Sequence, residues 1–360
     1  MKYPINIPHL YEEDKKYATE AIKTGWISSA GPMVKKFEDE FSKFCDRKYA
    51  VSVSNGSCAL LVAVASLKLP KGSEVILPST TIISCYNSIV QNDLVPVFCD
   101  VDLDTWTICP DSIEEKINDK TSAIMVVDLY GNMINVDRIK SIAKDNNLKV
   151  IEDAAEAHGA KYKDIVAGSF GDVSIFSFYS NKIITTGEGG MVVTDDLDIY
   201  QNAVNMKNLY FENREKYIHS DIGYNFRMTN VQAGLGLGQL ENVNKTIEHR
   251  RRIAKRYNER LRNNKYIQLP IEKENFFNVY WYFSILIKEN KKLVIDNLTK
   301  NKIGYRHFFK PLHTQSFINA MDMIPNSEYL HSVGINLPTY NDLTNDDIDF
   351  ICDKILEVLE

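Results

Sequence analysis

A regular alternation of short apolar runs with helix-like segments, between about residue 48 and residue 195, constrains the fold more than any other feature of the chain. The apolar runs are rich in valine and isoleucine and read YAVSVS, EVILP, VPVFCDVD, SAIMVVDLYG, KVIEDAA, VSIFSFYS and GGMVVTDD. Apolar strands that alternate with helices of about ten residues indicate a largely parallel sheet covered by helices on both faces. We therefore predict an α/β fold in which ligands bind outside the carboxyl ends of the strands.

The chain after residue 240 has a different pattern and predicts a second, smaller domain. Here ENVNKTIEHRRRIAKRYNERLRNN reads as a long helix whose basic residues form a solvated face. One apolar stripe recurs along it at helical spacing: Val243, Ile247, Ala254, Tyr257 and Leu261. Because 360 residues exceed a typical single core, we predict a large domain over residues 1–245 and a small α+β domain over residues 246–360. Within this division, the N-terminal segment of the large domain is a candidate to pack on the small domain.

Charge and hydropathy exclude two classes of partner. The chain has 42 basic and 48 acidic side chains, a net charge of -6, which opposes attraction to nucleic acid and to anionic membranes. The longest apolar run, ALLVAVASL, is too short to span a bilayer, and the N-terminus lacks an apolar signal segment, so we expect a cytoplasmic protein. The six cysteines form no CxxC pair and have no histidines at zinc-ligand spacing, which predicts free thiols and no metal site.

Three stretches carry candidate chemistry. In KVIEDAAEAHG, Asp153 ends a predicted strand, where it either acts on a ligand or caps the next helix. In VSNGSCALL, Gly56 and Ser57 start a helix with N–H groups and a hydroxyl that suit an anion, although such residues also cap helices that bind nothing. In FSFYSNKIITTGEGG, Lys182 precedes its glycines, whereas the lysine of a nucleotide-binding P-loop follows them.

The three stretches together match the needs of pyridoxal 5'-phosphate (PLP). A lysine that faces an enclosed site can lose its proton and form a Schiff base with a carbonyl; an ordinary surface lysine is the alternative for Lys182 alone. PLP also needs a carboxylate for its pyridine nitrogen and donors for its phosphate. The set therefore predicts PLP as the cofactor.

Six stretches, in order along nearly the whole chain, resemble motifs of the DegT-type nucleotide-sugar aminotransferases. They read WISSAGPMVKKFEDEF, VSNGSCAL, VIEDAAEAHGA, GSFGDVSIFSFYSNKIITTGEGGMVVTDD, GYNFRMTNVQAGLGLGQLE and FFKPLHTQ. The resemblance implies PLP fold type I, the aspartate aminotransferase fold, with a mainly parallel seven-stranded sheet in the large domain. Within the family the chain resembles the enzymes that aminate C4 of a GDP-4-keto-6-deoxy sugar with L-glutamate.

The resemblance also implies roles for the residues around the cofactor. Lys182 forms the Schiff base and moves the proton, Asp153 pairs with the pyridine nitrogen, and Glu156 lies near the phenolic oxygen. The residues that match the family's phosphate binders are Gly56, Ser57 and Ser177. Asn225 matches an asparagine that reaches the phosphate from the neighbouring subunit, which implies a homodimer with shared active sites.

The substrate side departs from the family pattern. Ile82 stands where relatives carry an aromatic residue that stacks on the cofactor, a contact that Tyr86 one turn later is a candidate to supply. DLYG, starting at Asp128, replaces HLYG in a loop expected to face the substrate. His313 in KPLHTQ is a candidate substrate contact, with a packing role as the alternative. These departures leave the sugar, its nucleotide and the choice between C3 and C4 open.

We therefore expect a PLP-dependent aminotransferase of deoxyamino-sugar biosynthesis, such as that of O-antigen. The alternatives are a PLP-dependent sugar 3-dehydratase, a transaminase of another keto sugar or small phosphorylated ketone, and a non-catalytic sensor of PLP or nucleotide sugar. Dehydratases of the family carry a histidine in place of the Schiff-base lysine, so Lys182 favours transamination.

Overall fold

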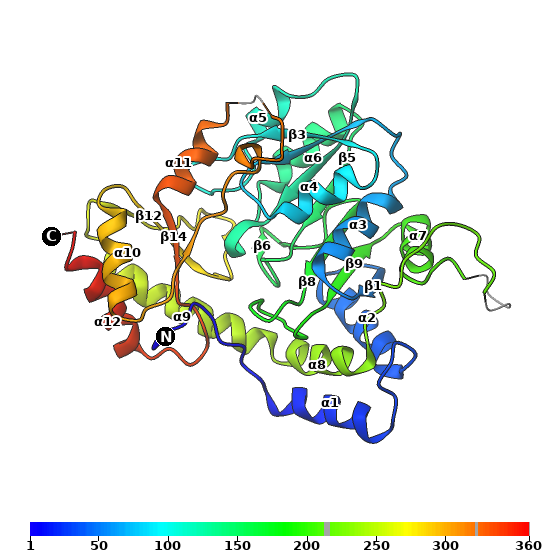
Figure 1. Cartoon of the computed structure of the whole chain (residues 1–360), viewed down its shortest axis with the longest axis horizontal. Coiled ribbons are helices and arrows are strands. Elements are labelled where there is room, and N and C mark those ends of the chain that lie inside the picture. Colours follow the sequence, from blue (N-terminus) through cyan, green and yellow to red (C-terminus); the bar gives the residue numbers. More distant parts are fainter. Residues whose placement is uncertain (212–216, 321–322, 360) are drawn as a thin grey trace.

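The structure is a computed structural model that describes residues 1–211, 217–320 and 323–359. It contains a large sheet with its helices and, beside it, a smaller sheet built from the C-terminal third of the chain (Figure 1). Each of these two sheets has its own cluster of buried apolar side chains.

The large sheet has seven strands in the order β1-β9-β8-β5-β4-β2-β3. They are β1 (Tyr49–Val53), β2 (Glu74–Pro78), β3 (Val95–Cys99), β4 (Thr121–Val127), β5 (Lys149–Asp153), β8 (Val173–Ser177) and β9 (Gly190–Thr194). Strand β9 runs antiparallel to β1 and β8, and the other neighbouring pairs are parallel. The predicted α/β fold with a mainly parallel seven-stranded sheet is confirmed.

Helices cover this sheet and connect its strands. They are α2 (Pro32–Phe44), α3 (Gly56–Ser66), α4 (Ile83–Val90), α5 (Pro110–Glu114), η1 (Leu129–Gly131), α6 (Val136–Asp145), α7 (Leu197–Lys207) and α8 (Asn230–Glu241). Helix α3 packs against β8 and β9, and its apolar sequence fits this because nearly every side chain after its first turn is buried. The side chain of Asn55 begins α3 by accepting a hydrogen bond from the Cys58 N–H (2.8 Å).

The smaller sheet is antiparallel, in the order β10-β12-β14-β13. Its elements are α9 (Val243–Leu261), β10 (Ile267–Gln268), β12 (Phe283–Ile287), α10 (Lys291–Lys300), β13 (Arg306–His307), η2 (Leu312–Thr314), α11 (Pro325–Val333), β14 (Gly334–Leu337) and α12 (Asn345–Leu356). Helix α9 links the two apolar clusters, because Ile247 belongs to the first and Tyr257 to the second. The proposed domain boundary at residue 245 falls in the first turn of α9.

The N-terminal segment lies along the smaller sheet before it reaches the large one (Figure 1). Tyr3 forms a bridge with Ile303 and accepts a hydrogen bond from the Gly304 N–H (2.6 Å), and Ile5 accepts one from the Thr339 N–H (3.1 Å). Helix α1 (Glu12–Lys23) then packs on α8. The N-terminal segment therefore contacts loops beside the smaller sheet and a helix of the large domain.

Two expectations about polar residues have clear outcomes. All six cysteines are free thiols, as predicted. The basic run of α9 is not simply a solvated face, because Arg250 is buried and donates to the Trp281 carbonyl (3.1 Å) and to Asn6 Oδ1 (2.9 Å). Within residues 1–211, 217–320 and 323–359, no helix combines the length and apolar character needed to cross a membrane.

Candidate active site

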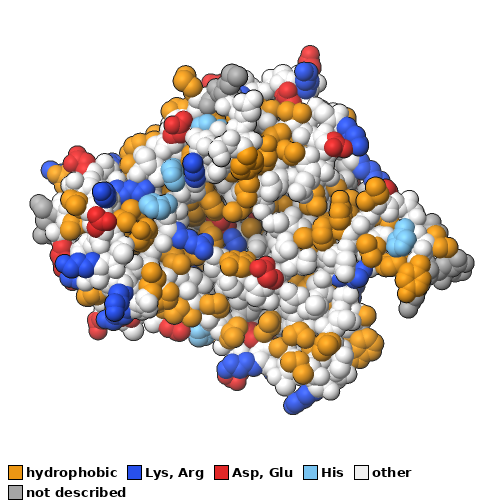
Figure 2. Space-filling model, viewed as in Figure 1, with side chains coloured by type: hydrophobic (Ala, Val, Ile, Leu, Met, Phe, Trp, Pro, Cys, Tyr) orange, Lys and Arg blue, Asp and Glu red, His pale blue; other side chains and the backbone are white. Residues whose placement is uncertain are grey.

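A cavity of about 580 Å³ lies outside the carboxyl ends of β5 and β8. The predicted residues among those that line it are Gly56, Ser57, Asp153, Glu156, Ser177 and Lys182. The face shown in Figure 2 is hollowed near its middle, with basic and acidic side chains beside the hollow. Because β5 and β8 are neighbouring parallel strands, residues that follow them meet at one edge of the sheet.

Lys182 is held by a tight turn between β8 and β9. Its N–H donates to the Tyr179 carbonyl (2.9 Å), and the Thr186 N–H donates to the Phe178 carbonyl (2.9 Å). Gly187 has a φ of +80°, a conformation that favours glycine and closes the turn before β9. The glycines of the motif therefore set the backbone that presents Lys182.

The Lys182 ammonium lies among carboxylates and an aromatic ring. Its Nζ is 3.5 Å from Glu156 Oε1 and 3.8 Å from the centre of the Trp281 ring. Burial lowers the pKa of Lys182, an effect that the charges of Glu156 and Asp153 oppose. A lowered pKa makes the neutral, nucleophilic form of the amine easier to reach, which is what a Schiff-base lysine requires.

Asp153 and Glu156 form the acidic side of the cavity. Asp153 Oδ1 accepts a hydrogen bond from the Ala155 N–H (3.0 Å), and its Oδ2 accepts one from the Cys85 thiol (3.3 Å). Glu156 Oε2 accepts one from the Tyr130 N–H (3.0 Å). Burial raises the pKa of both carboxyl groups, and the charge of Lys182 counteracts the rise. A buried carboxylate of this kind favours a cationic partner such as a pyridinium.

Gly56, Ser57 and Ser177 lie together at the N-terminus of α3. A Cβ atom added to Gly56 would lie 2.8 Å from Ser177 Cβ and 3.0 Å from Ser177 Oγ, so only glycine permits this approach. Ser57 Oγ is 2.7 Å from Ser84 Oγ at the start of α4. Backbone N–H groups, hydroxyls and the positive end of the α3 dipole therefore converge, and this donor set fits the phosphate of PLP.

Trp281, Asn181, Arg306 and Phe309 also line the cavity, and the sequence did not single them out. Trp281 Nε1 donates to the Asn181 carbonyl (2.6 Å), which fixes the indole beside Lys182. Arg306 lies on β13 with its guanidinium 5.7 Å from the Tyr282 ring. The sequence signals were that Asn181 and Phe309 fall inside the quoted FSFYSNKIITTGEGG and FFKPLHTQ motifs and that Trp281 falls inside an apolar run.

Three predicted residues lie outside the lining of this cavity. Tyr86 stacks on Phe98 with ring centres 6.1 Å apart. His313 is buried, with Nδ1 2.7 Å from Ser79 Oγ and Nε2 3.2 Å from Glu328 Oε1. The third, Asn225, is exposed at the surface. Ile82, which replaces the family's aromatic residue, does line the cavity.

Asp128, the first residue of the DLYG loop that was expected to face the substrate, is not among the residues that line the cavity. Its side chain is fully buried, and its Oδ1 accepts a hydrogen bond from the Ile134 N–H (3.1 Å). Burial raises its pKa, and the neighbouring carboxylate of Glu152 raises it further. The Ser174 hydroxyl donates a hydrogen bond to Glu152 Oε2 (2.6 Å). The carboxyl groups of Asp128 and Glu152 therefore form a buried pair with a structural role.

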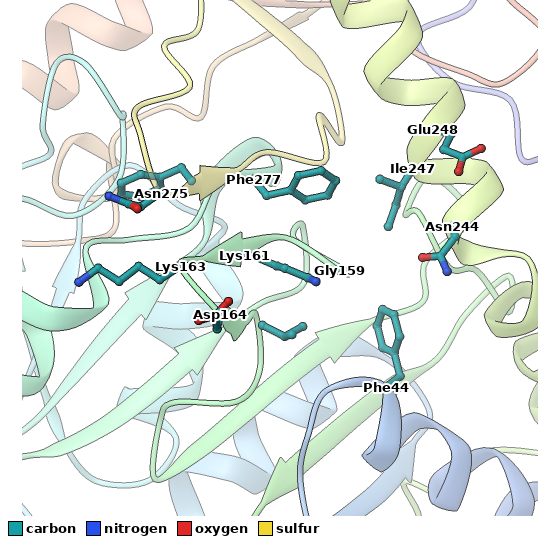
Figure 3. Close-up of a pocket in the computed structure, with 12 residues that line it drawn as sticks. Phe44, Gly159, Lys161, Lys163, Asp164, Asn244, Ile247, Glu248, Asn275 and Phe277 are labelled. Atoms are coloured by element: carbon teal, nitrogen blue, oxygen red, sulfur yellow. The ribbon is translucent and has the colours of Figure 1, made fainter.

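A larger cavity of about 990 Å³ lies elsewhere, between α9 and the short sheet formed by β6 (Lys161–Tyr162), β7 (Ile165–Val166) and β11 (Phe276–Phe277). Figure 3 shows Ile247 and Phe44 on one side of it and Asn275 on the other. It contains none of the residues predicted to carry chemistry, so the smaller cavity is the candidate active site.

Comparisons with known proteins match the chain from end to end. The sequence profile of the DegT/DnrJ/EryC1/StrS aminotransferase family matches residues 8–356. GDP-perosamine synthase of Escherichia coli O157:H7 is 41% identical over 99% of this chain and 99% of its own length. An aminotransferase of pseudoaminic acid biosynthesis from Helicobacter pylori has a TM-score of 0.94 at 25% identity, covering 99% of both chains. An E. coli GDP-4-keto-6-deoxy-D-mannose-3-dehydratase with bound hydrated PLP has a TM-score of 0.92 at 27% identity, covering 99% of both chains.

Proposed function

The chain belongs to the DegT/DnrJ/EryC1/StrS aminotransferase family, and we propose that it transfers the amino group of L-glutamate to C4 of a GDP-linked 4-keto-6-deoxy sugar. The predicted class, a PLP-dependent aminotransferase of fold type I, is confirmed. The observation that carries the proposal is the enclosed Lys182, which shares a cavity with two carboxylates and the N-terminus of α3.

PLP, when bound, supplies an aldehyde carbon that carries the amino group and a ring that stabilises negative charge on the substrate carbon. In our proposal Lys182 Nζ would hold the aldehyde carbon of PLP, and the released amine would move a proton at the substrate carbon. Burial lowers the pKa of Lys182, which suits both tasks. Trp281 keeps water away from one side of the amine, since its ring centre is 3.8 Å from Nζ.

The other cavity residues would orient the cofactor. Asp153 would hold a proton on the pyridine nitrogen, and Glu156 would lie near the phenolic oxygen. The phosphate would bind the first turn of α3, with the Ser57 and Ser177 hydroxyls as further donors. Geometry supports this division, because the acidic side chains follow β5 whereas the donors lie at the start of α3 and the end of β8.

Both proposed substrates are anions, and Arg306 gives the cavity a guanidinium to receive them. We propose that Arg306 binds the glutamate carboxylate or the diphosphate of the nucleotide sugar. The GDP-linked sugar is favoured because the chain is 41% identical, over its full length, to a GDP-perosamine synthase. A sugar 3-dehydratase is not favoured, because Lys182 is present and enclosed.

We further propose a cytoplasmic homodimer with shared active sites. Asn225 is exposed and lies outside the cavity of its own chain. An asparagine placed at the surface is free to reach the phosphate site of a second copy. The exposed apolar side chains of Tyr224 and Ile222 on the same segment support burial against such a copy.

The experiment that tests the function follows the two half-reactions separately. PLP-loaded protein is mixed with glutamate, and the change in cofactor absorbance reports the first half-reaction. The amine-loaded protein is then offered GDP-, UDP- and dTDP-linked 4-keto-6-deoxy sugars. We expect the GDP-linked sugar to take the amino group from the natural protein rapidly. We expect no transfer in the Lys182→Ala protein. Discharge only by a small phosphorylated ketone, or full turnover by Lys182→Ala, would contradict the proposal.

A further inference from the structure

The Cys85 thiol lies against the carboxylate that we propose as the partner of the pyridine nitrogen. Cys85 is in the first turn of α4 and is fully buried, next to Ser84 and Asp153, which line the cavity. Its Sγ is 3.3 Å from Asp153 Oδ2 and 3.3 Å from Thr81 Oγ1. Sulfur hydrogen bonds are longer than those of oxygen, so both contacts lie within bonding range.

The direction of these hydrogen bonds follows from the groups that face one another. Burial raises the pKa of the Cys85 thiol well above its ordinary value, and the Asp153 charge adds to the rise, so the sulfur keeps its proton. An ionised carboxylate only accepts, which makes Cys85 the donor to Asp153 Oδ2. The Thr81 hydroxyl is then free to donate to the sulfur, and the two bonds form a short chain that ends at the carboxylate.

The two oxygens of Asp153 are consequently held by different donors. The Ala155 N–H, from the backbone after β5, binds Oδ1 at 3.0 Å. The Cys85 thiol, from α4, binds Oδ2. The carboxylate plane turns about the Cβ–Cγ bond, and hydrogen bonds to both oxygens from separate elements restrict this rotation more than one bond does. A thiol is a weak donor, so it orients the carboxylate while removing little of its negative charge.

We propose that Cys85 is a positioning residue whose thiol orients the Asp153 carboxylate toward the pyridine nitrogen of PLP. The inference rests on the proposed role of Asp153. It goes further because it assigns a purpose to a buried cysteine that the transamination chemistry does not itself use. It also predicts that a hydroxyl can replace the thiol, whereas a methyl group cannot.

The test compares apoproteins that carry Cys85→Ser, Cys85→Ala, Asp153→Asn or Cys99→Ala. Cys99 is a matched control, because it is equally buried in the adjacent β3 and its thiol donates to the Leu77 carbonyl rather than to the site (3.4 Å). The dissociation constant of PLP is measured by titration. The S–H stretching band, identified as the infrared band lost in Cys85→Ser, is followed in the protein without cofactor.

We expect Cys85→Ala to weaken PLP binding about tenfold, as the loss of one donor to a charged group predicts. Cys85→Ser is expected within about threefold of the natural chain, and Cys99→Ala to be unchanged. The S–H band should move toward that of a free thiol in Asp153→Asn. If Cys85→Ala fails to fold, the S–H shift in Asp153→Asn and the PLP affinity of Cys85→Ser decide whether the inference holds.

Several results would overturn the inference, and they separate it from the function itself. A positioning role for Cys85 is contradicted by unchanged PLP binding in Cys85→Ala, or by equal losses of PLP affinity in Cys85→Ala and Cys85→Ser. It is also contradicted by an S–H band that does not shift in Asp153→Asn. If Asp153→Asn weakens PLP binding but Cys85→Ala does not, only this inference fails. If Asp153→Asn binds PLP as the natural chain does, the proposed role of Asp153 fails as well.

Discussion

Replacing Gly56 by alanine should separate cofactor binding from catalysis, because the new methyl group collides with Ser177 at the start of α3. The added Cβ would lie 2.8 Å from Ser177 Cβ, whereas carbon atoms normally rest about 3.5–4.0 Å apart. The strand cannot give way easily, since Ser177 is paired with Gly190 and Gly190 itself packs against the Asn55 carbonyl. The first turn of α3 must therefore move by about 1 Å.

This displacement has two measurable consequences. Overpacking of this kind costs about 1–3 kcal/mol in the free energy of unfolding. The N–H groups of the α3 first turn would also lose part of their hydrogen bonding to the phosphate, each such bond contributing about 1.5–3 kcal/mol. We therefore expect the dissociation constant of PLP to rise about 10- to 100-fold. Turnover at saturating PLP should change little, because Lys182 and Asp153 keep their places.

Titration of Gly56→Ala apoprotein with PLP measures the first quantity, and urea unfolding measures the second. The double variant Gly56→Ala with Ser177→Gly removes the collision, so it should unfold at a higher urea concentration than Gly56→Ala alone. It should still bind PLP weakly, because the Ser177 hydroxyl is gone. A Gly56→Ala protein with the stability and PLP affinity of the natural chain would refute the described contact between α3 and β8.

Two further predictions concern charge. The raised pKa of Asp128 means that the folded chain binds more protons than the unfolded chain, so stability falls as pH rises above the ordinary aspartate value. Asp128→Asn should therefore gain about 1 kcal/mol in urea unfolding at about pH 8 and nothing near about pH 4, and a gain independent of pH would argue against this cause. Arg306→Gln should raise the KM of an anionic substrate about tenfold or more while PLP affinity stays constant. Steady-state kinetics with each substrate varied in turn would show unchanged KM values if Arg306 had no such role.

Much of the sheet follows from the sequence, because its strands are nearly continuous apolar runs. KVIED and VSIFS form the neighbouring parallel strands β5 and β8, which explains why Asp153 and Lys182 lie at one edge. Lys182 also has a local signal in the glycines that follow it. Both residues therefore lie in short stretches whose motifs the sequence shows, next to strands that the apolar runs predict.

The rest of the site depends on how the smaller sheet packs against the large one. Trp281 and Arg306 reach the cavity from the segment before β12 and from β13, far along the chain from Lys182, and no local pattern marks that approach. Asp128 is a different case, since the resemblance placed its loop toward the substrate whereas its own side chain is buried. The backbone turns at Tyr130, which has a φ of 55°, and Asp128 Oδ1 accepts a hydrogen bond from the Ile134 N–H. Arg250 likewise sits in a basic run, yet it is buried by contacts with Trp281 and Asn6.

The central claim is the transfer of nitrogen from glutamate to C4 of a GDP-linked 4-keto-6-deoxy sugar through Lys182. Its most direct test incubates PLP-loaded protein with isotopically labelled glutamate and this sugar, and locates the label in the purified product by nuclear magnetic resonance. The account predicts labelled nitrogen on C4 with the natural chain and no labelled product with Lys182→Ala. Label on C3, no label in the sugar, or equal labelling by the Lys182→Ala protein would contradict it.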